Sequence, residues 1–247
     1  MANLVVDIGN TFTKLGLFEG DVLISVNQFP GEDDSQITQY INGLSAQRAI
    51  LSSVKKERAN WQWVLENEMP VEYFDRRMAL GINNHYLTPD TLGLDRLAAV
   101  TGAAHLYWGK NNLVIDGGTC ITYDYVDAGA NYFGGSISPG IKMRYSALNY
   151  YTDALPVVET DAGFKAQSGT DTTTSIRSGV QNGIKHELEG FINDYKKDGE
   201  ELNVILTGGD ANFFDTLLKN SIFAPCIKIE PHLVLKGLNA AIQKQND

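Results

Sequence analysis

The chain has 247 residues, enough to bury a sizeable core in one large domain or two small ones. Its formal net charge of −10 and its pI near 4.8 argue against non-specific binding to nucleic acid or to an anionic membrane. No leader pattern, no apolar run near the ~18 residues of a membrane span and no paired cysteine spacing is present, so a soluble cytoplasmic protein is expected.

The chain opens on an apolar run that ends in Asp7 and is followed by Gly9-Asn10. That dipeptide readily accepts positive φ and is expected to close a tight hairpin. An exposed turn binds anions through its N–H groups, and an Asp beside it suits a hydrated Mg²⁺ carried in by phosphates. The stretch predicts either a nucleotide-phosphate hairpin or an ordinary surface hairpin with a capping Asp. Its mouth also carries two hydroxyls and a cation, on Thr11, Thr13 and Lys14.

The remainder of the first half predicts an antiparallel meander followed by alternating helices and strands. This order indicates a mixed sheet with helices packed against it. Strands are expected at 13–18, 22–29, 49–54 and 71–74, and helices at 33–47 and 55–67.

Residues 78–93 form a long loop that leads into Leu92-Gly93-Leu94-Asp95-Arg96 and a helix reaching about Trp108. A loop of this length inside a compact domain is more often functional than idle. Asp95 then lies at a helix N-terminus, where the helix dipole favours a carboxylate. It is either a capping residue beside an exposed Arg, or a base that accepts a proton from a substrate hydroxyl while Arg96 binds an anion.

Residues 113–125 repeat the opening pattern at a shift of 109 positions (113 − 4). Each copy is an apolar strand, an Asp, a glycine turn and a returning strand with hydroxyls. The repeat predicts a duplicated domain whose two halves face each other across a cleft. The matching positions are Leu4 and Leu113, Asp7 and Asp116, Gly9 and Gly118, and Thr13 and Thr122.

The second half continues with the same alternation of elements. Strands are expected at 131–140, 204–206 and 227–229, and helices at 142–151, from about 176 to 197, at 211–219 and at 233–243. Glycines after the strand at 204–206 allow a flat ring or a phosphate to approach the backbone. The hydroxyls of 172–175 either cap the following helix or hold a ligand at its start.

Several catalytic signatures are missing from the sequence. It has no GxxxxGK[ST] loop, no GxGxxG after a strand, no protein-kinase signature and no GxSxG elbow. The four histidines have no ligand spacing, and neither cysteine has a nearby His partner. Carboxylates, hydroxyls, glycine turns and a few cations remain, which are the groups used in phosphoryl transfer.

Five motifs together resemble type III pantothenate kinases, of the acetate kinase, sugar kinase, Hsp70 and actin superfamily. They are DIGNTFTK at 7–14, LGLDR at 92–96, DGGTCIT at 116–122, GGSISPG at 134–140 and TGG at 207–209. The resemblance implies an α/β fold of two ribonuclease-H-like (actin-like ATPase) domains with mixed sheets and an interdomain cleft. It also implies a homodimer that uses ATP to phosphorylate pantothenate at its 4′ position, the first step of coenzyme A synthesis. Mg²⁺ on the nucleotide and activation by K⁺ or NH₄⁺ are implied as well.

The same resemblance assigns roles to individual residues. Asp95 falls on the catalytic base, Asp116 on the monovalent-cation ligand and Thr119 on a further ATP contact. The substrate threonine falls on Thr172, where the run to Thr174 leaves the register open by one or two residues. Substrate contacts fall on Tyr86, Gly93, Leu94, Asp95 and Arg96, and the ATP loop falls on Asp7, Ile8, Gly9, Asn10, Thr11, Phe12, Thr13 and Lys14.

Two alternatives compete with this interpretation. One is a kinase for another small hydroxylated substrate on the same fold, against which the GLDR loop argues. The other is a non-catalytic regulatory protein of the same fold, against which the presence of both Asp7 and Asp95 argues. The domains are expected at 1–111 and 112–247.

Overall fold

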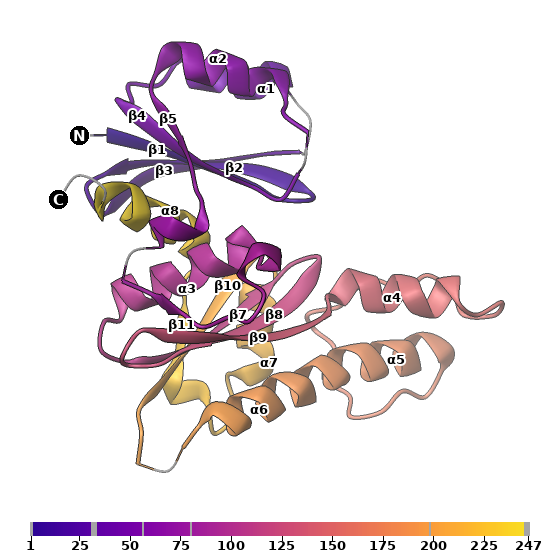
Figure 1. Ribbon diagram of the computed structural model, residues 1–247. Helices are drawn as coiled ribbons and strands as arrows, with labels where there is room; N and C mark the ends of the chain where they lie inside the picture. The colour runs from indigo at the N-terminus through magenta and orange to yellow at the C-terminus, as the bar shows by residue number, and fades with distance from the viewer. Residues whose placement is uncertain (1, 31–33, 56, 80, 198, 245–247) are drawn as a thin grey trace. The chain divides into compact units, whose positions relative to one another are not determined.

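The computed structural model describes residues 2–30, 34–55, 57–79, 81–197 and 199–244 (Figure 1). Residues 33, 56 and 80, which the sequence places in two helices and in the long loop, lie outside this description. Within it, no helix is both long enough and apolar enough to cross a membrane.

The chain divides into two compact units. Unit 1 comprises Met1–Gly109, Gly129–Phe133 and His232–Asp247, and unit 2 comprises Lys110–Ala128 and Gly134–Pro231. The boundary expected at 111/112 lies close to the change of unit at Gly109. The segment from His232 onward, expected in the second domain, belongs to unit 1.

Unit 1 contains a five-stranded mixed sheet in the order β3-β2-β1-β4-β5. The central β1 pairs antiparallel with β2 and parallel with β4, so the meander gives way to parallel pairing where the first helices intervene. The strands are β1 (Ala2–Ile8), β2 (Phe12–Glu19), β3 (Val22–Pro30), β4 (Arg48–Ser53) and β5 (Val71–Tyr73).

The second sheet has six strands in the order β11-β10-β7-β8-β9-β6. Its central β7 pairs antiparallel with β8 and parallel with β10. The strands are β6 (Asn83–Asn84), β7 (Asn111–Gly117), β8 (Cys120–Val126), β9 (Asn131–Pro139), β10 (Leu202–Gly208) and β11 (Ile227–Ile229).

The two sheets repeat one topology. Each strand of the first sheet has an equivalent at the same place in the strand order of the second sheet. The equivalent pairs are β1 and β7, β2 and β8, β3 and β9, β4 and β10, and β5 and β11. The repeat at a shift of 109 positions, found between Leu4 and Leu113, therefore extends to whole sheets. The short β6, which comes from the loop expected at 78–93, is added at the far edge beside β9.

Helices cover these sheets where their apolar stripes can be buried. In unit 1, α1 (Asp34–Asn42) and α2 (Asn60–Glu68) pack on one face, and α3 (Leu94–Leu106) and α8 (Leu233–Lys244) lie on the other. In unit 2 the core joins the sheet to α4 (Ile141–Tyr150), α5 (Thr172–Arg177), α6 (Gly183–Tyr195) and α7 (Ala211–Leu218). A π-helical turn, Ser178–Asn182, links α5 to α6 where one continuous helix was expected.

Helices α3 and α8 approach so closely that their crossing has no room for side chains. A Cβ added at Gly237 would lie 1.9 Å from the Ala98 carbonyl oxygen, and one at Gly102 would lie 2.6 Å from that of Leu233. These glycines therefore let the last helix of the chain pack directly against α3. Because α8 also contacts β1 and β4, unit 1 contains both ends of the chain.

Two predicted helix boundaries were wrong: α1 ends at Asn42 and not at residue 47, and α2 begins at Asn60 and not near Lys55. The Ser53 hydroxyl accepts a hydrogen bond from the Lys55 backbone N–H at 3.0 Å and holds the chain in a turn after β4. The helix starts later, where the Gln62 side chain accepts from the Ala59 N–H at 3.1 Å.

Candidate active site

The hairpin between β1 and β2 is closed by a hydrogen bond of 3.0 Å from Gly9 N to the Phe12 carbonyl oxygen. The expected positive φ was wrong, since neither Gly9 nor Asn10 has one. Positive φ is required in two-residue hairpin loops of type I′ or II′, whereas this loop consists of residues 9–11. Asn10, Thr11 and Phe12 are exposed, so the loop is open to a ligand.

Asp7 lies on the face of the unit 1 sheet that α8 covers. Alternate residues of a strand share a face, and Asn3 donates from Nδ2 to Asn239 Oδ1 of α8 at 3.1 Å. Asp7 is therefore on that face too. Its partners on the neighbouring strands are Lys14 of β2 and Ser52 of β4. A cation, a carboxylate and a hydroxyl thus form a row across three strands.

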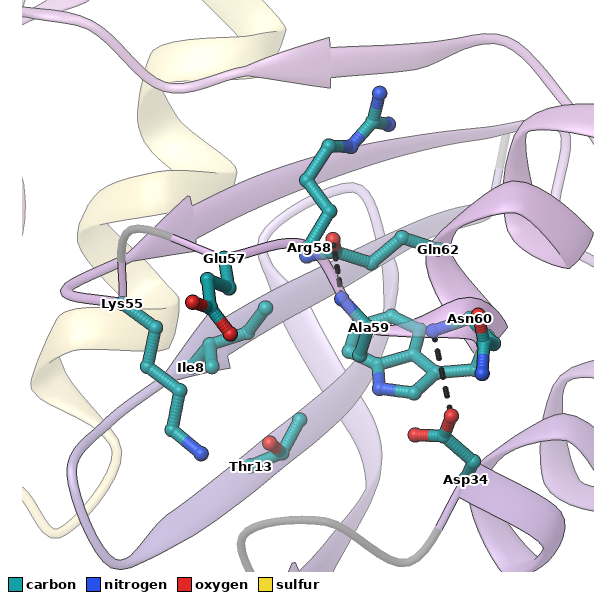
Figure 2. Close-up of a pocket in the computed structure, with 10 residues that line it drawn as sticks. Ile8, Thr13, Asp34, Lys55, Glu57, Arg58, Ala59, Asn60 and Gln62 are labelled. Atoms are coloured by element: carbon teal, nitrogen blue, oxygen red, sulfur yellow. Dashed lines mark hydrogen bonds between the residues drawn. The ribbon is translucent and has the colours of Figure 1, made fainter.

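The other side of the same hairpin borders a pocket of about 370 Å³ (Figure 2). Ile8 and Thr13, which pair with each other, line it together with residues of the segment between β4 and α2. Lys55 points toward Thr13 in Figure 2, and Asp34 accepts a hydrogen bond from Asn60 N at 3.3 Å. Asp7 and Lys14 are not among the lining residues. The expected ATP loop therefore presents its side chains to two different faces.

Asp95 occupies the first turn of α3, as its position in the sequence suggested. Its carboxylate folds back toward the helix start, where Oδ1 accepts from Arg96 N at 2.8 Å. Gly93 makes room for this conformation, because a Cβ there would lie 2.4 Å from the same Oδ1. The Asp95 carboxylate can therefore adopt this conformation only because residue 93 is a glycine.

Arg96 is not the exposed residue that the capping alternative assumed; it is only 7% exposed. Its guanidinium carbon lies 5.8 Å from the centre of the Tyr86 ring, which in turn stacks on Tyr132 at 6.4 Å. A cation against an aromatic ring has the chemistry to bind a small anionic or polar ligand. The structure thus brings Tyr86 and the Gly93–Arg96 segment together within unit 1.

Arg76 holds the approach to this segment in place, and nothing in the sequence pattern singled it out. Its guanidinium donates to the backbone carbonyl oxygens of Pro89, of Asp90 at 2.6 Å and of Leu92 at 3.3 Å. Arg76 comes from a short 3-10 helix, η1 (Arg76–Met78), which precedes the contacted carbonyl groups by 13 to 16 residues. Such a contact arises from tertiary structure and could not be found by spacing.

In unit 2, Asp116 ends the apolar part of β7 as Asp7 ends that of β1. Its carboxylate lies against Gly208, where a Cβ would be 2.2 Å from Oδ1. The adjacent turn is held by a hydrogen bond of 3.1 Å from Gly140 N to the Thr119 carbonyl oxygen. The Thr119 side chain is exposed. Three motifs, DGGT, SPG and TGG, thus meet around Asp116.

Comparison with known proteins identifies the family of the chain. The family model for type III pantothenate kinase matches residues 3–194. A type III pantothenate kinase of Bacteroides fragilis is 41% identical over 245 residues, which cover 99% of this chain and 98% of the relative. The chain belongs to the type III pantothenate kinase family.

Solved structures place this family member in a wider fold group. A conserved putative Baf family transcriptional activator from Campylobacter jejuni has a TM-score of 0.63 at 21% identity and 98% coverage of both chains. A putative 2-dehydro-3-deoxygalactonokinase from Sinorhizobium meliloti has a TM-score of 0.58 at 14% identity, covering 98% of this chain and 99% of that one. At these identities the likeness concerns the fold, which is the α/β fold of two ribonuclease-H-like domains.

Thr172, the expected substrate threonine, is the first residue of α5 and is exposed. The helix is capped by Asp171, whose Oδ1 accepts from Thr174 N at 2.9 Å. The Thr174 hydroxyl in turn accepts from the N–H groups of Thr170 and Asp171. Thr174 is thus used for capping. Thr172 belongs to unit 2, whereas Tyr86 and Arg96 belong to unit 1.

Among the described residues, no group of three or more His, Cys, Asp or Glu side chains is close enough to hold a metal ion. Asp7, with a hydroxyl and a cation beside it, fits Mg²⁺ that is bound mainly by water and phosphate oxygens. It does not resemble a site in which the protein supplies the whole coordination sphere.

Glu187 of α6 organises the polar side of unit 2 in this family member. Its carboxylate accepts from Tyr123 Oη at 2.8 Å, Ser138 Oγ at 2.6 Å and Arg144 Nη2 at 2.6 Å. Burial alone raises the pKa of Glu187, but the hydrogen bonds from Ser138, Arg144 and Tyr123 outweigh burial and hold its pKa below the usual range. Arg144 also donates to the Pro139 carbonyl oxygen at 2.8 Å, so the network supports the turn that contacts Thr119.

We expect Glu187→Gln to lower the free energy of unfolding at pH 7 by about 1.5–3 kcal/mol, because a charge-assisted hydrogen bond is lost in a half-buried site. Since the folded-state pKa is depressed, this stabilisation is fully present above the unfolded pKa of about 4.3 and is lost as pH falls through the folded value. Thermal melts at pH 7 and at steps below about pH 4.3 test this: the difference in melting temperature between wild type and variant should narrow as the pH falls.

The matched control is Glu189→Gln on the same helix, where the pair with Lys185 is 3.9 Å apart and partly exposed. Such a pair contributes about 0.3–0.5 kcal/mol, so this variant should melt close to wild type. A Glu187 variant that melts like the Glu189 variant at pH 7 would show that the network does not stabilise unit 2.

Proposed function

We propose that this protein transfers the γ-phosphoryl group of ATP to the 4′ hydroxyl of pantothenate, which is the first step of coenzyme A synthesis. The observation that carries the proposal is the arrangement at the start of α3. There the Asp95 carboxylate is fixed through Oδ1 to the Arg96 N–H, beside a buried Arg96 that faces Tyr86. Full-length similarity to type III pantothenate kinases supports the substrate.

Asp95 acts as the base in this proposal. Oδ1 is held by the backbone, and no hydrogen bond from a described residue reaches Oδ2, which can take the proton of the primary hydroxyl. The alkoxide oxygen forms a bond to the γ-phosphorus as the bond to the β-phosphate oxygen breaks, and ADP leaves. The guanidinium of Arg96 binds the pantothenate carboxylate, and the Tyr86 ring packs along the substrate.

The hairpin holds the nucleotide in this proposal. The N–H groups of Asn10 and Thr11 bind the phosphates, since the Gly9 N–H closes the hairpin, and Lys14 supplies a cation beside Asp7. Mg²⁺, when bound, neutralises charge on the phosphate oxygens. Asp7 would hold it through its hydration shell, while Thr119 contacts ATP and Asp116 holds K⁺ or NH₄⁺ in unit 2. Thr172 contacts pantothenate, the protein acts as a homodimer, and the reaction takes place in the cytoplasm.

A coupled ADP-release assay tests the function. Pantothenate should support ADP formation with Mg²⁺, K⁺ should raise the rate, and a panel of sugars of similar size should not replace pantothenate. Mass spectrometry should find the product heavier by one phosphoryl group. ADP release with a sugar but not with pantothenate would favour another kinase activity, and no release with any substrate would favour a non-catalytic role.

A further inference from the structure

Ser52 has a buried hydroxyl that the structure leaves unused. The residue is 1% exposed, and its Oγ has no hydrogen-bond partner among the described residues. Buried polar groups are nearly always hydrogen-bonded, and an unpaired hydroxyl destabilises the fold that contains it. An alanine would avoid that cost, so the presence of a serine calls for a functional explanation.

The hydroxyl lies beside Asp7. Ser52 of β4 pairs in parallel register with Asp7 of β1, so both side chains point to the same face of the sheet. Strands that pair in this way are about 4.8 Å apart, within reach of a rotation about the Ser52 χ1 angle. On the other side of Asp7, in antiparallel register, stands Lys14.

The next residue along β4 shows how different this position is. Ser53 pairs with Ile8, which lines the pocket in Figure 2, so its side chain lies on the opposite face of the sheet from that of Ser52. Its hydroxyl accepts from Lys55 N at 3.0 Å and donates to the Lys55 carbonyl oxygen at 3.2 Å. Ser53 therefore has a local structural use that accounts for its hydroxyl, and Ser52 has none.

The second copy of the topology carries the same feature. In unit 2, Asp116 of β7 pairs with Thr207 of β10, which occupies the position of Ser52 and is also 1% exposed. A hydroxyl residue thus stands next to the carboxylate on the equivalent strand of both sheets. Simple packing would be served as well by Ala or Val, so the recurrence points to the carboxylate as the reason for the hydroxyl.

We propose that Ser52 is a positioning residue for Asp7. When ATP binds with Mg²⁺, the Ser52 side chain rotates and donates its hydroxyl hydrogen to one Asp7 carboxylate oxygen. The other oxygen then faces the ligand in a fixed orientation. This inference rests on the proposed nucleotide site at the hairpin, and it predicts that the hydroxyl aids binding at the expense of stability in the free protein.

The test compares Ser52→Ala with wild type in two measurements. Thermal melts without ligand should show that the variant melts at the same temperature or a few degrees higher, because an unpaired buried hydroxyl is removed. Calorimetry should show that the variant binds ATP with Mg²⁺ about 10–100-fold more weakly, the loss of one hydrogen bond to a charged group. Affinity for ATP without Mg²⁺ and the KM for pantothenate should stay within twofold of wild type.

Two further variants serve as controls. Ser52→Thr keeps the hydroxyl, as unit 2 does with Thr207, and should restore binding of ATP with Mg²⁺ to within about twofold of wild type. Ser53→Ala removes two hydrogen bonds that the structure shows, so it should melt at a lower temperature while the change in affinity specific to Mg²⁺ is absent.

Either of two results for Ser52→Ala would overturn the inference: a lower melting temperature without ligand, or an unchanged affinity for ATP with Mg²⁺. The first outcome would make the hydroxyl structural, and the second would leave Asp7 independent of it. Failure of the proposed function looks different. If wild type binds ATP with Mg²⁺ but does not phosphorylate pantothenate, the proposed reaction is wrong. The comparison of Ser52→Ala with wild type then still tests the role of Ser52. If wild type does not bind ATP, both proposals fall.

Discussion

Asp95→Asn should lower kcat for pantothenate phosphorylation by about 10²–10⁴-fold, the usual contribution of a positioned general base. An asparagine keeps the size of the side chain and an oxygen that accepts from Arg96 N, so the start of α3 should be preserved. The lost property is the capacity to take a proton. Steady-state kinetics with ATP and pantothenate measures the effect, and the affinity for ATP alone should change by less than about twofold.

The matched control is Asp90→Asn, which makes the same chemical change on an exposed residue of the loop before α3. The Asp90 backbone carbonyl oxygen contacts Arg76, and an asparagine leaves that contact intact. This variant should therefore keep wild-type kcat and KM. Normal turnover in the Asp95 variant would exclude the base role and return Asp95 to the status of a helix-capping residue.

The second large effect is expected at the crossing of α3 and α8. Gly237→Ala would place a Cβ 1.9 Å from the Ala98 carbonyl oxygen, a contact that neither backbone can relieve without moving a helix. We expect the free energy of unfolding to fall by about 3 kcal/mol, at the upper end of typical overpacking costs. Since α3 carries Asp95 and Arg96, kcat/KM should fall along with stability.

Because of where the tryptophans lie, their fluorescence reports the unfolding of unit 1. All three, Trp61, Trp63 and Trp108, lie in unit 1, whereas helices of both units contribute to far-ultraviolet circular dichroism. In urea, the fluorescence transition of Gly237→Ala should shift to lower denaturant. Gly190→Ala, at an exposed position of α6, meets nothing within 4 Å and should be neutral or stabilising by up to about 1 kcal/mol. Equal transitions for both glycine variants would mean that the crossing tolerates a side chain.

Most of the fold could be predicted from periodicity because its elements are short and strongly patterned. Strands such as β1 and β7 are apolar runs that end in a carboxylate, and their repetition revealed the duplication before any contact was known. What periodicity could not reveal was the partner of each element. The closing helix was predicted correctly as a helix but placed in the second domain, since its contact with α3 depends on Gly102 and Gly237 and not on sequence proximity.

The candidate site shows the same limit. Motif spacing and family resemblance singled out Asp7, Asp95 and Asp116, which all stand at the end of a strand or the start of a helix. Arg76 and Ser52 were missed, because their importance comes from neighbours that only the tertiary structure supplies. The burial of Arg96 was missed for the same reason, as a charged residue after Asp95 looks solvent-exposed in a helical pattern.

The late position of α8 in the sequence has a consequence for biosynthesis. The face of β1 and β4 that α8 covers is made early, but the helix that covers it is translated only after residues 110–231. At about 5–20 residues per second, a ribosome needs roughly 6–24 s for those 122 residues (231 − 110 + 1). During that interval the nascent N-terminal sheet has an uncovered apolar surface. Unit 2, although second in the chain, is therefore the first unit that can complete its fold. The uncovered face of the N-terminal sheet is a surface that chaperones can shield.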